Sequence, residues 1–464
     1  MKVLVQPPGS ILMSSYKLRR RRKKAVIIGL DGTPFSLLRA LCEERKLPNF
    51  GDILRNGTFK PMCTALPEVS SVAWTSFMTG KNPGKHSIYG FTDLQPYSYS
   101  IYFPNYASTK SETLWDILGT YGKRSVVINL PSTYPARELN GAMISGFVAV
   151  DLEKAVYPQA LVSKLNDIGY RIDIDLEKAQ ESKDYLLEDL NLTLEKREQT
   201  ILELMDNEEW DLFIGVITET DRLHHFLWGE MENGNSSYRE AFIDYYKKID
   251  TFIGKIYDRI DNNTLFIILS DHGFCKVKKQ VYLNYWLNQN GYLSYKTDSP
   301  KLIADLDGTR TKAFCLDPGR IYINLENRFP KGLVKESNYT AFREELKEVL
   351  SNLKLSNSSG EEAVIKQIYT KEEIYQGPYL DRAPDLVVLP QLGWDLKGSV
   401  SKGVLTDNGP WTGMHTFDNA FLFISEQVAD NNFRIFDAMP TALSYLEVVV
   451  PSDVDGQGLL DQKT

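Results

Sequence analysis

The sequence contains 464 residues, of which 42% are hydrophobic and 25% are charged. These values are ordinary for a globular protein and exclude a disordered or fibrous chain. The formal net charge is −8, although residues 1–24 carry eight Lys or Arg and no acidic residue. The rest of the chain is therefore more acidic than the total, which argues against nucleic-acid binding as the main function.

The first 24 residues are expected to form a basic, flexible arm that precedes the first strand. Lys and Arg occupy seven of the eight positions from 17 to 24. Such a run could contact an anionic surface weakly, through the release of counterions. A non-catalytic docking protein that binds membrane or nucleic acid through this arm is therefore one alternative function, although no stable nucleic-acid partner is expected.

No membrane-spanning or export segment is predicted. No apolar run approaches the roughly 18 residues that a transmembrane helix needs, and the first 24 residues lack the hydrophobic core of a signal peptide. The four cysteines form no CxxC pair and no regular spacing, which argues against a disulfide framework or a cysteine zinc site. These features predict a cytoplasmic protein, and they leave its oligomeric state open.

Three short apolar runs predict buried strands that each end close to an acidic residue. Residues 186–206 and 238–259, which lie between these strands, have helical periodicity. This alternation of strands and helices predicts an α/β protein. We expect three layers, with a mostly parallel central sheet and helices on both faces. Because ligands gather beyond the carboxyl ends of such strands, the acids are expected to meet there. The strands are residues 25–30, 212–218 and 265–270, and the acids are Asp31, Asp221 and Asp271.

Two stretches interrupt this pattern with aromatic and turn-rich sequence. Residues 92–185 are expected to form a rim insertion, and residues 276–410 a smaller inserted cap region that faces the substrate. The catalytic core would comprise residues 25–275 and 411–464. Three aromatic residues of the cap are expected to pack in its interior rather than to stack on a base: Tyr285, Trp286 and Tyr292.

Three of the five histidines stand in contexts typical of metal ligands. His225 follows Asp221 by four residues, a spacing that can direct both side chains to one side of a helical turn. Mixed nitrogen and oxygen ligands without a thiolate favour zinc, with manganese or iron as alternatives. His86 and His224 are expected to be structural. The predicted site has three carboxylates and three imidazoles, which suit two divalent ions: Asp31, Asp221, His225, Asp271, His272 and His415.

Ser70 is the expected nucleophile. A helix over residues 71–79, ended by Gly80, would place Ser70 at its N-cap. There the free backbone N–H groups and the positive end of the helix dipole favour an alkoxide and a phosphate oxygen. An adjacent two-metal centre would remove the need for a histidine base, because divalent ions lower the pKa of a neighbouring hydroxyl. A capping role alone is the alternative for this serine.

Several motifs, spread over most of the chain, share the pattern of one known group of enzymes. They span Ile28–Gly32, Leu47–Phe50, Ser70–Gly80, Asn82–His86, Thr220–His225, Ser270–Gly273, Gly413–His415, Met439–Leu446 and Pro451–Gly456. Together they resemble the alkaline phosphatase superfamily and, within it, the type I phosphodiesterase/nucleotide pyrophosphatase family. The resemblance implies an alkaline-phosphatase-like three-layer sandwich and metal-dependent hydrolysis of phosphodiester or pyrophosphate bonds through a phosphoserine intermediate.

The resemblance also implies how the ligands divide between the two ions. Ser70 would bridge both ions and attack phosphorus in line. The ligands of one ion would be Asp221, His225 and His415. The ligands of the other ion would be Asp31, Asp271 and His272.

Two features depart from the pattern common in nucleotide pyrophosphatases. The nucleophile is Ser70 where those enzymes commonly carry threonine, and Phe91 stands where they carry a phosphate-binding asparagine. These departures argue against assigning nucleotide specificity from the resemblance. Phosphomonoester hydrolysis and phosphotransfer on the same core are alternatives, because the chemistry of the site does not separate them from diester hydrolysis. Lys81 and Lys85 are expected to be solvated rather than bound to phosphate. The expected partner is a small phosphorylated substrate, whose identity the sequence does not reveal.

Overall fold

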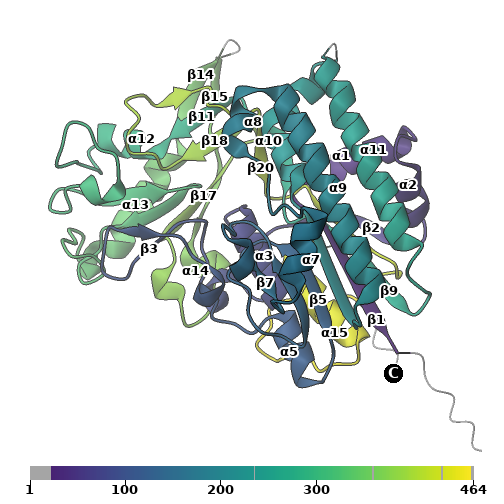
Figure 1. Cartoon of the computed structure of the whole chain (residues 1–464). Helices are drawn as coiled ribbons and strands as arrows, with labels where there is room; N and C mark the ends of the chain where they lie inside the picture. The colour runs from purple at the N-terminus through teal and green to yellow at the C-terminus, as the bar shows by residue number, and fades with distance from the viewer. Residues whose placement is uncertain (1–21, 235, 358–359, 430–431, 461–464) are drawn as a thin grey trace, which may run out of the picture.

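The computed structural model describes residues 22–234, 236–357, 360–429 and 432–460. Its larger body is built on a nine-stranded sheet, and a smaller body lies beside it (Figure 1). The large sheet has the order β22-β2-β21-β9-β1-β8-β5-β6-β7. In that order its strands are Phe433–Arg434, Thr58–Cys63, Ala420–Ile424, Thr264–Leu269, Lys24–Leu30, Leu212–Ile217, Ser125–Leu130, Gly141–Ser145 and Val156–Tyr157.

The centre of the sheet is parallel. β9, β1, β8, β5 and β6 pair in parallel, whereas β21 and β7 run antiparallel to their neighbours β9 and β6. Along β1, Val26 and Ile28 face one hydrophobic cluster, and Ala25 and Ile27 face another. Burial on both faces explains why these strands read as continuous apolar runs rather than as alternating ones. The predicted α/β class is confirmed.

Helices cover both faces of this sheet. The cluster around Val26 includes residues of α1 (Phe35–Glu43), α2 (Pro48–Leu54), α6 (Leu152–Ala155), α7 (Leu161–Ile168), α8 (Leu176–Glu181), α9 (Lys183–Asn207), α10 (Glu219–Glu232) and α11 (Ser237–Tyr257). The cluster around Ile27 includes residues of α3 (Ser70–Thr79), α5 (Leu114–Thr120) and α15 (Ala438–Tyr445). The short helix α4 (Pro83–His86) follows α3.

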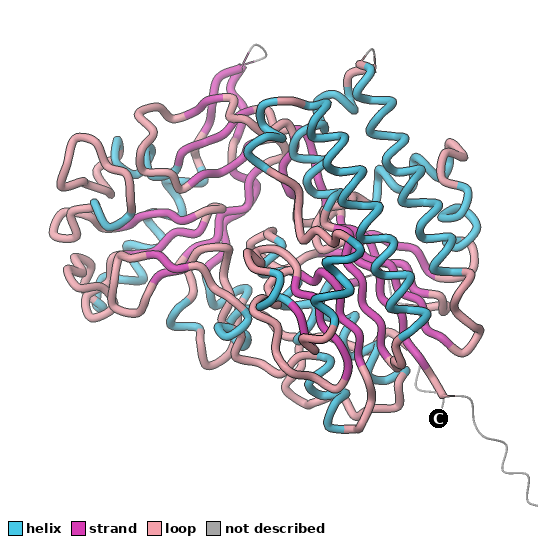
Figure 2. The backbone as a smooth tube through the Cα atoms, in the orientation of Figure 1, coloured by secondary structure: helices cyan, strands magenta, loops and turns pink. Residues whose placement is uncertain are grey.

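The smaller body has its own sheets (Figure 2). It also has its own hydrophobic core. One sheet has the order β18-β11-β19, formed by Trp394–Lys397, Lys279–Tyr282 and Thr406–Asp407. A second has the order β12-β13-β17-β16, formed by Ala313–Leu316, Arg320–Ile323, Leu386–Pro390 and Ile365–Thr370. The remaining elements are the hairpin β14–β15 (Lys354–Asn357, Gly360–Ala363) and the helices α12 (Leu283–Gln289), α13 (Tyr339–Ser351) and α14 (Lys371–Ile374).

The antiparallel pair β10 (Gly273–Lys276) and β20 (Gly413–Thr416) marks where the chain leaves the large body and where it returns. The smaller body lies between these strands in sequence, in the segment expected to form the cap. Trp286 and Tyr292 are buried in its core, with stacked rings 6.1 Å apart, and Tyr285 is half-buried. Trp286 and Tyr292 are therefore not free to stack on a base, as predicted, whereas Tyr285 is not part of this core.

The expectation of a rim insertion over residues 92–185 needs correction. β5, β6 and β7, all within this range, are strands of the central sheet. They were missed because none of them ends in the Asp or Asp-His pattern that marks the other three strands. The hairpin of β3 (Asp93–Leu94) and β4 (Ile101–Tyr102) does approach the smaller body, since Leu94 packs against its core.

The expected basic arm also needs correction at its end. Residues 1–21 lie outside the described part of the chain, but Lys24 begins β1 and pairs with Thr264. Arg22 forms an ion pair with Asp211. The last residues of the basic run are therefore anchored to the sheet.

Two further expectations from the sequence concern disulfide bonds and membrane-spanning helices. The four cysteines are free thiols. Within the described ranges, no helix is both long enough and apolar enough to cross a bilayer.

Candidate metal centre

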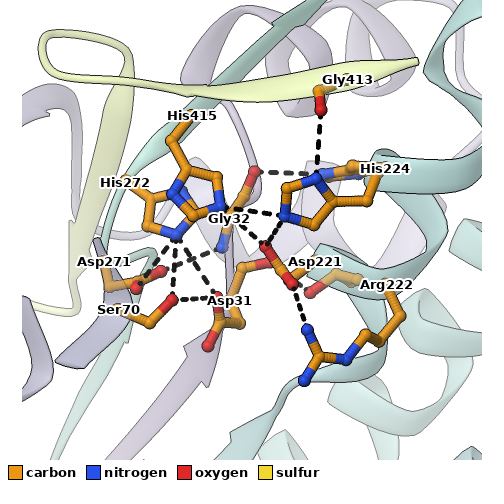
Figure 3. Close-up of polar contacts among 12 residues, drawn as sticks. Asp31, Gly32, Ser70, Asp221, Arg222, His224, Asp271, His272, Gly413 and His415 are labelled. Carbon is orange, nitrogen blue, oxygen red and sulfur yellow. Dashed lines mark hydrogen bonds and ion pairs between the residues drawn. The ribbon is translucent and has the colours of Figure 1, made fainter. Parts of the chain in front are cut away.

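The side chains predicted to form the site meet beyond the carboxyl ends of β1, β8 and β9 (Figure 3). Asp31 follows β1 directly, and Asp271 follows Ser270 at the end of β9. Asp221 lies in the first turn of α10, after β8, and His225 lies one turn further along this helix. His415 comes from β20, so the returning chain closes the site.

Ser70 lies in one half of the site. Its Oγ donates a hydrogen bond to Asp31 Oδ1 at 3.3 Å and lies 3.1 Å from His272 Nε2. The same nitrogen is 3.3 Å from Asp271 Oδ2 and 3.6 Å from Asp31 Oδ1. Two carboxylate oxygens, one imidazole nitrogen and one hydroxyl therefore surround a common point.

Asp221, His225 and His415 form the other half. Asp221 Oδ1 lies 3.4 Å from His225 Nε2 and 3.2 Å from His415 Nε2, and the two Nε2 atoms are 3.1 Å apart. The rings of His272 and His415 stack with centroids 3.6 Å apart and so connect the two halves. His272 accordingly lies within 4.8 Å of ligand atoms from both halves.

A backbone carbonyl fixes the orientation of each imidazole ring. The oxygen atoms of Gly413, Gly273 and Glu68 accept hydrogen bonds from Nδ1 of His225, His272 and His415, at 3.0, 3.1 and 2.9 Å. A carbonyl oxygen can only accept, so Nδ1 carries the hydrogen and Nε2 of the neutral ring presents a lone pair. All three lone pairs face inward, as in histidines that bind metals.

Each carboxylate is held in a similar way, by one of its two oxygens. Trp74 Nε1 donates to Asp31 Oδ2 at 3.0 Å, the Gly32 N–H to Asp271 Oδ1 at 2.9 Å, and Arg222 Nη1 to Asp221 Oδ2 at 3.0 Å. The second oxygen of each carboxylate faces the cluster. Asp271 Oδ2 is buried and accepts no hydrogen bond from the described residues.

The pKa shifts of the cluster follow from its burial and its closely packed carboxylates. Burial raises the pKa of Asp271 to about 6. Burial, together with the charges of Asp271 and Asp221, raises the pKa of Asp31 well above its usual range. Burial also lowers the pKa of His272 well below its usual range, which keeps that ring neutral. Carboxylates and lone pairs packed this closely repel one another unless cations lie between them. Two divalent ions fit this donor set.

The pKa values of Asp221 and His415 are shifted in the opposite directions to those of Asp31, Asp271 and His272. Burial opposes ionisation of Asp221, but His225 and His415 hold the pKa of this carboxyl well below its usual range. Burial likewise opposes protonation of His415, but its hydrogen bond to Asp221 raises the pKa of the ring.

Ser70 is the first residue of α3 and not its N-cap, which corrects the expected position. Val69 is the N-cap, with φ −131° and ψ 145°, and its carbonyl accepts from the N–H groups of Val72 and Ala73. The Ser70 hydroxyl is therefore free to face the cluster instead of capping the helix. Within the described ranges, the N–H groups of Ser70 and Ser71 have no acceptor.

The neighbouring hydroxyls do not contact the cluster. Ser71 Oγ is buried without a partner in the described structure, and Thr75 Oγ1 donates to the Ser71 carbonyl at 2.6 Å. Gly80 ends α3 in the left-handed conformation, with φ 64°, at the position expected from the sequence.

The other residues considered from the sequence lie outside the cluster. His224 Nδ1 lies 3.1 Å from the Gly32 carbonyl, and its Nε2 lies 2.8 Å from the Tyr246 hydroxyl. His86 Nε2 lies 3.0 Å from Ser76 Oγ. Lys81 and Lys85 form ion pairs with Asp453 and Asp455. These lysines are therefore bound to carboxylates, and their expected free solvation is incorrect.

Sequence reasoning missed the residues that hold the ligands in place. Trp74 and Arg222 lie inside motifs already singled out, Ser70–Gly80 and Thr220–His225, so both could have been found as donors. The three carbonyl acceptors have no sequence signal, because every residue carries a carbonyl.

An α/β sheet with acids, imidazoles and a serine meeting at its carboxyl edge is the architecture of an alkaline-phosphatase-like phosphoric ester hydrolase. The chain belongs to the type I phosphodiesterase / nucleotide pyrophosphatase family, whose model matches residues 25–418. It is therefore an enzyme of the alkaline phosphatase superfamily, whose members use divalent metal ions. This classification replaces the alternative of a non-catalytic docking protein. No curated protein sequence matches the chain.

Solved structures share this fold at low sequence identity. Phosphonoacetate hydrolase from Sinorhizobium meliloti, in complex with phosphonoformate, is 15% identical, with a TM-score of 0.62 over 92% of this chain and 96% of that one. Murine ectonucleotide pyrophosphatase / phosphodiesterase 5, in complex with AMP, is 13% identical, with a TM-score of 0.55 over the same shares. Alkaline phosphatase PafA is 15% identical, with a TM-score of 0.60 over 95% and 98% of the two chains.

Proposed function

We propose that this chain hydrolyses phosphodiester or pyrophosphate bonds at a centre of two divalent ions, through a phosphoserine formed on Ser70. One observation carries the proposal. Asp221 Oδ1 and the Nε2 atoms of His225 and His415 lie 3.1 to 3.4 Å apart, and in the neutral rings all three atoms are acceptors. Such a triangle is stable only around a cation or a proton, and Ser70 lies in the adjoining half of the site.

The proposed ligand sets follow the two halves of the site. One ion would be held by Asp221, His225 and His415, and the other by Asp31, Asp271 and His272, with Ser70 between them. Nitrogen and oxygen donors without a thiolate favour zinc, with manganese or iron as alternatives. When bound, the two ions supply Lewis acidity and offset the negative charge of the phosphoryl oxygens.

The protein's own groups prepare Ser70 for attack. Its hydroxyl donates to Asp31 Oδ1, which makes this carboxylate the first acceptor for the serine proton. Ser70 Oγ then forms a bond to phosphorus, and the bond to the leaving oxygen breaks with its electron pair. Water hydrolyses the phosphoserine in a second step. The free N–H groups at the start of α3 favour a phosphoryl oxygen beside Ser70.

The test compares two chromogenic esters, bis-p-nitrophenyl phosphate and p-nitrophenyl phosphate, with chelated and metal-restored protein. We expect preference for the diester, loss of turnover on chelation, and recovery with Zn²⁺ or Mn²⁺. Ser70→Ala should lose turnover and should not be labelled as phosphoserine. Ser71→Ala is the matched control, because its hydroxyl contacts nothing in the cluster, and it should retain turnover within a few-fold.

Two results would overturn parts of this proposal. Undiminished turnover by Ser70→Ala would refute the nucleophile. Preference for the monoester would replace diester hydrolysis by phosphomonoester hydrolysis, or by phosphotransfer if an added alcohol takes up the phosphoryl group.

We also infer a cytoplasmic location, because the four cysteines are free thiols and such thiols persist in reducing compartments. Fractionation of the cells that make the protein would test this inference. Recovery from the culture medium or from an extracytoplasmic fraction would contradict it.

A further inference from the structure

Arg222 is tightly held beside the metal-ligand carboxylates. Its Nη1 donates to Asp221 Oδ2 at 3.0 Å, and its Nη2 and Nε donate to Asp173 at 2.6 and 3.2 Å. The guanidinium carbon lies 4.6 Å from the centre of the Phe147 ring, and Phe91 packs against that ring at 5.6 Å. The side chain of Arg222 is only 13% exposed. These contacts fix its position.

The guanidinium of Arg222 can donate further hydrogen bonds. An arginine side chain has five N–H bonds, and the contacts to Asp221 and Asp173 use one on each nitrogen. Each terminal nitrogen therefore keeps a second N–H, for which the described residues offer no acceptor. Donors of a buried cation that lack a protein acceptor are costly unless a ligand or water uses them.

The location of Arg222 indicates which ligand would use them. Figure 3 shows Asp31 between Ser70 and Asp221, with the guanidinium of Arg222 beside Asp221. Among the Lys and Arg side chains in the described part of the chain, Arg222 is the one that forms an ion pair with a carboxylate of the proposed metal site. Lys81 and Lys85 are bound elsewhere.

We propose that Arg222 binds substrate directly, by donating its two unused N–H bonds to non-bridging oxygens of the phosphoryl group that Ser70 attacks. The proposal rests on the proposed function and adds a specificity residue to it. A planar guanidinium matches a phosphoryl group with two directed hydrogen bonds, which a lysine ammonium cannot reproduce. Asp173 and Phe147 act through Arg222, as positioning residues that hold its plane.

The competing interpretation is that Arg222 only orients Asp221. The two roles predict different results for metal binding and for phosphate binding. Loss of a residue that only orients Asp221 should weaken metal binding. Loss of a residue that donates hydrogen bonds to the phosphoryl group should weaken phosphate binding.

The experiment uses metal-loaded Arg222→Ala and Arg222→Lys and the wild-type chain. Metal content per chain is measured by atomic emission, the affinity for inorganic phosphate by calorimetry, and kcat and KM with the better nitrophenyl ester. Because Arg222 also holds Asp221, the metal affinity of Arg222→Ala should fall about 10-fold. At metal concentrations that saturate both sites, we expect Arg222→Ala to keep both ions but to bind phosphate about 10- to 100-fold more weakly, as for a lost charge-assisted hydrogen bond. Arg222→Lys should recover little of this affinity, and added guanidinium ion should partly restore Arg222→Ala.

Arg259→Ala is the matched control. Arg259 is another guanidinium bound to an aspartate, Asp206, but it lies outside the cluster. This variant should keep the metal content, the phosphate affinity and the kinetic constants of the wild-type chain.

Either of two outcomes would overturn the role of Arg222 in substrate binding. One is a phosphate affinity of Arg222→Ala within two-fold of the wild-type value, and the other is loss of an ion from this variant. If Arg222→Ala does not fold, Arg222→Lys gives the same decision, with wild-type phosphate affinity as the contradicting result. A wild-type chain that holds two ions without hydrolysing any phosphoester would instead contradict the proposed function.

Discussion

Every ligand side chain of the candidate centre is held by its outer atom and presents its inner atom to the cluster. Trp74 shows what such a contact does, because its Nε1 fixes Asp31 Oδ2 and thereby turns Oδ1 toward Ser70 and His272. The indole ring itself is fully buried. Its roles in packing and in orienting Asp31 can therefore be separated by substitution.

Trp74→Phe is expected to weaken divalent-metal binding about 10-fold, the usual effect of losing a contact that orients a ligand. Competition with a chromogenic chelator measures the affinity. Trp115→Phe is the matched control, because Trp115 is also buried and its Nε1 bonds to the Tyr106 hydroxyl at 2.8 Å, away from the cluster. If both variants lose stability equally and neither loses metal affinity, the Trp74 contact does not orient Asp31 for metal.

The pKa shifts predict how metal affinity depends on pH. The pKa of Asp271 is raised to about 6 and that of Asp31 is raised well above its usual range, in both cases chiefly by burial. The pKa of His415 is also raised, through Asp221 and against burial. A group with a raised pKa holds a proton below that pKa and must release it before it binds metal. Metal affinity should therefore rise with pH through about 6 and fall as pH falls below it.

Calorimetry at pH 6 in buffers of different ionisation enthalpy checks this prediction. The account requires a net release of protons for each ion bound. A binding enthalpy that does not depend on the buffer would show that no proton is released, in conflict with the assigned ligands.

At the scale of elements, the site depends on the close approach of α3 to β1. A Cβ atom at Gly29 of β1 would overlap the ring of Trp74, which projects from α3. Glycine at this position lets the helix lie close enough for Trp74 to reach Asp31, two residues beyond Gly29. A single packing contact therefore brings α3, which carries the proposed nucleophile Ser70, close to Asp31.

Gly29→Ala is expected to destabilise the fold by about 1–3 kcal/mol, as overpacking in a well-packed core does, and to weaken metal binding because Trp74 must move. Urea denaturation and the chelator competition measure the two effects. Gly403→Ala should change neither quantity, because a Cβ there would meet no atom within 4 Å. Wild-type stability in Gly29→Ala would show that the contact is not tight.

The same elements show what the sequence can and cannot reveal. The strands before Asp31 and Asp271 are predictable, because strands buried on both faces of a parallel sheet are apolar throughout. β5 is not found by a search for acid-ended strands, since its last residues, Asn129 and Leu130, carry no acid. Ser70 is identified by its motif, but its place inside the helix depends on Val69, whose extended conformation has no sequence signal.

At the scale of the whole molecule, the site is completed by a long return of the chain. β10 leaves the large body after His272, and β20 brings back His415, with Phe274 paired opposite His415. No local pattern encodes this pairing, because the smaller body lies between the two strands in sequence. Both the context of His415 in Gly413–His415 and the resemblance to a known family predict that it is a ligand, but neither indicates that it lies opposite Phe274.

The smaller body is connected to the site through the strand pair β10–β20. β11 follows β10 in the chain, β18 precedes β20, and β11 and β18 pair with each other. The position of the smaller body is therefore tied to the strand pair that carries His415. Its aromatic residues Trp286 and Tyr292 are used in its own core. These two rings are therefore not available to stack on a leaving group.

Anomalous diffraction from crystals of the metal-loaded protein would locate the bound ions. We expect two peaks at the absorption edge of the bound metal. One should lie among Asp221, His225 and His415, the other among Asp31, Asp271 and His272, and Ser70 Oγ should lie next to both. A fully loaded crystal with no peak among these side chains, or with both peaks remote from Ser70, would contradict the account.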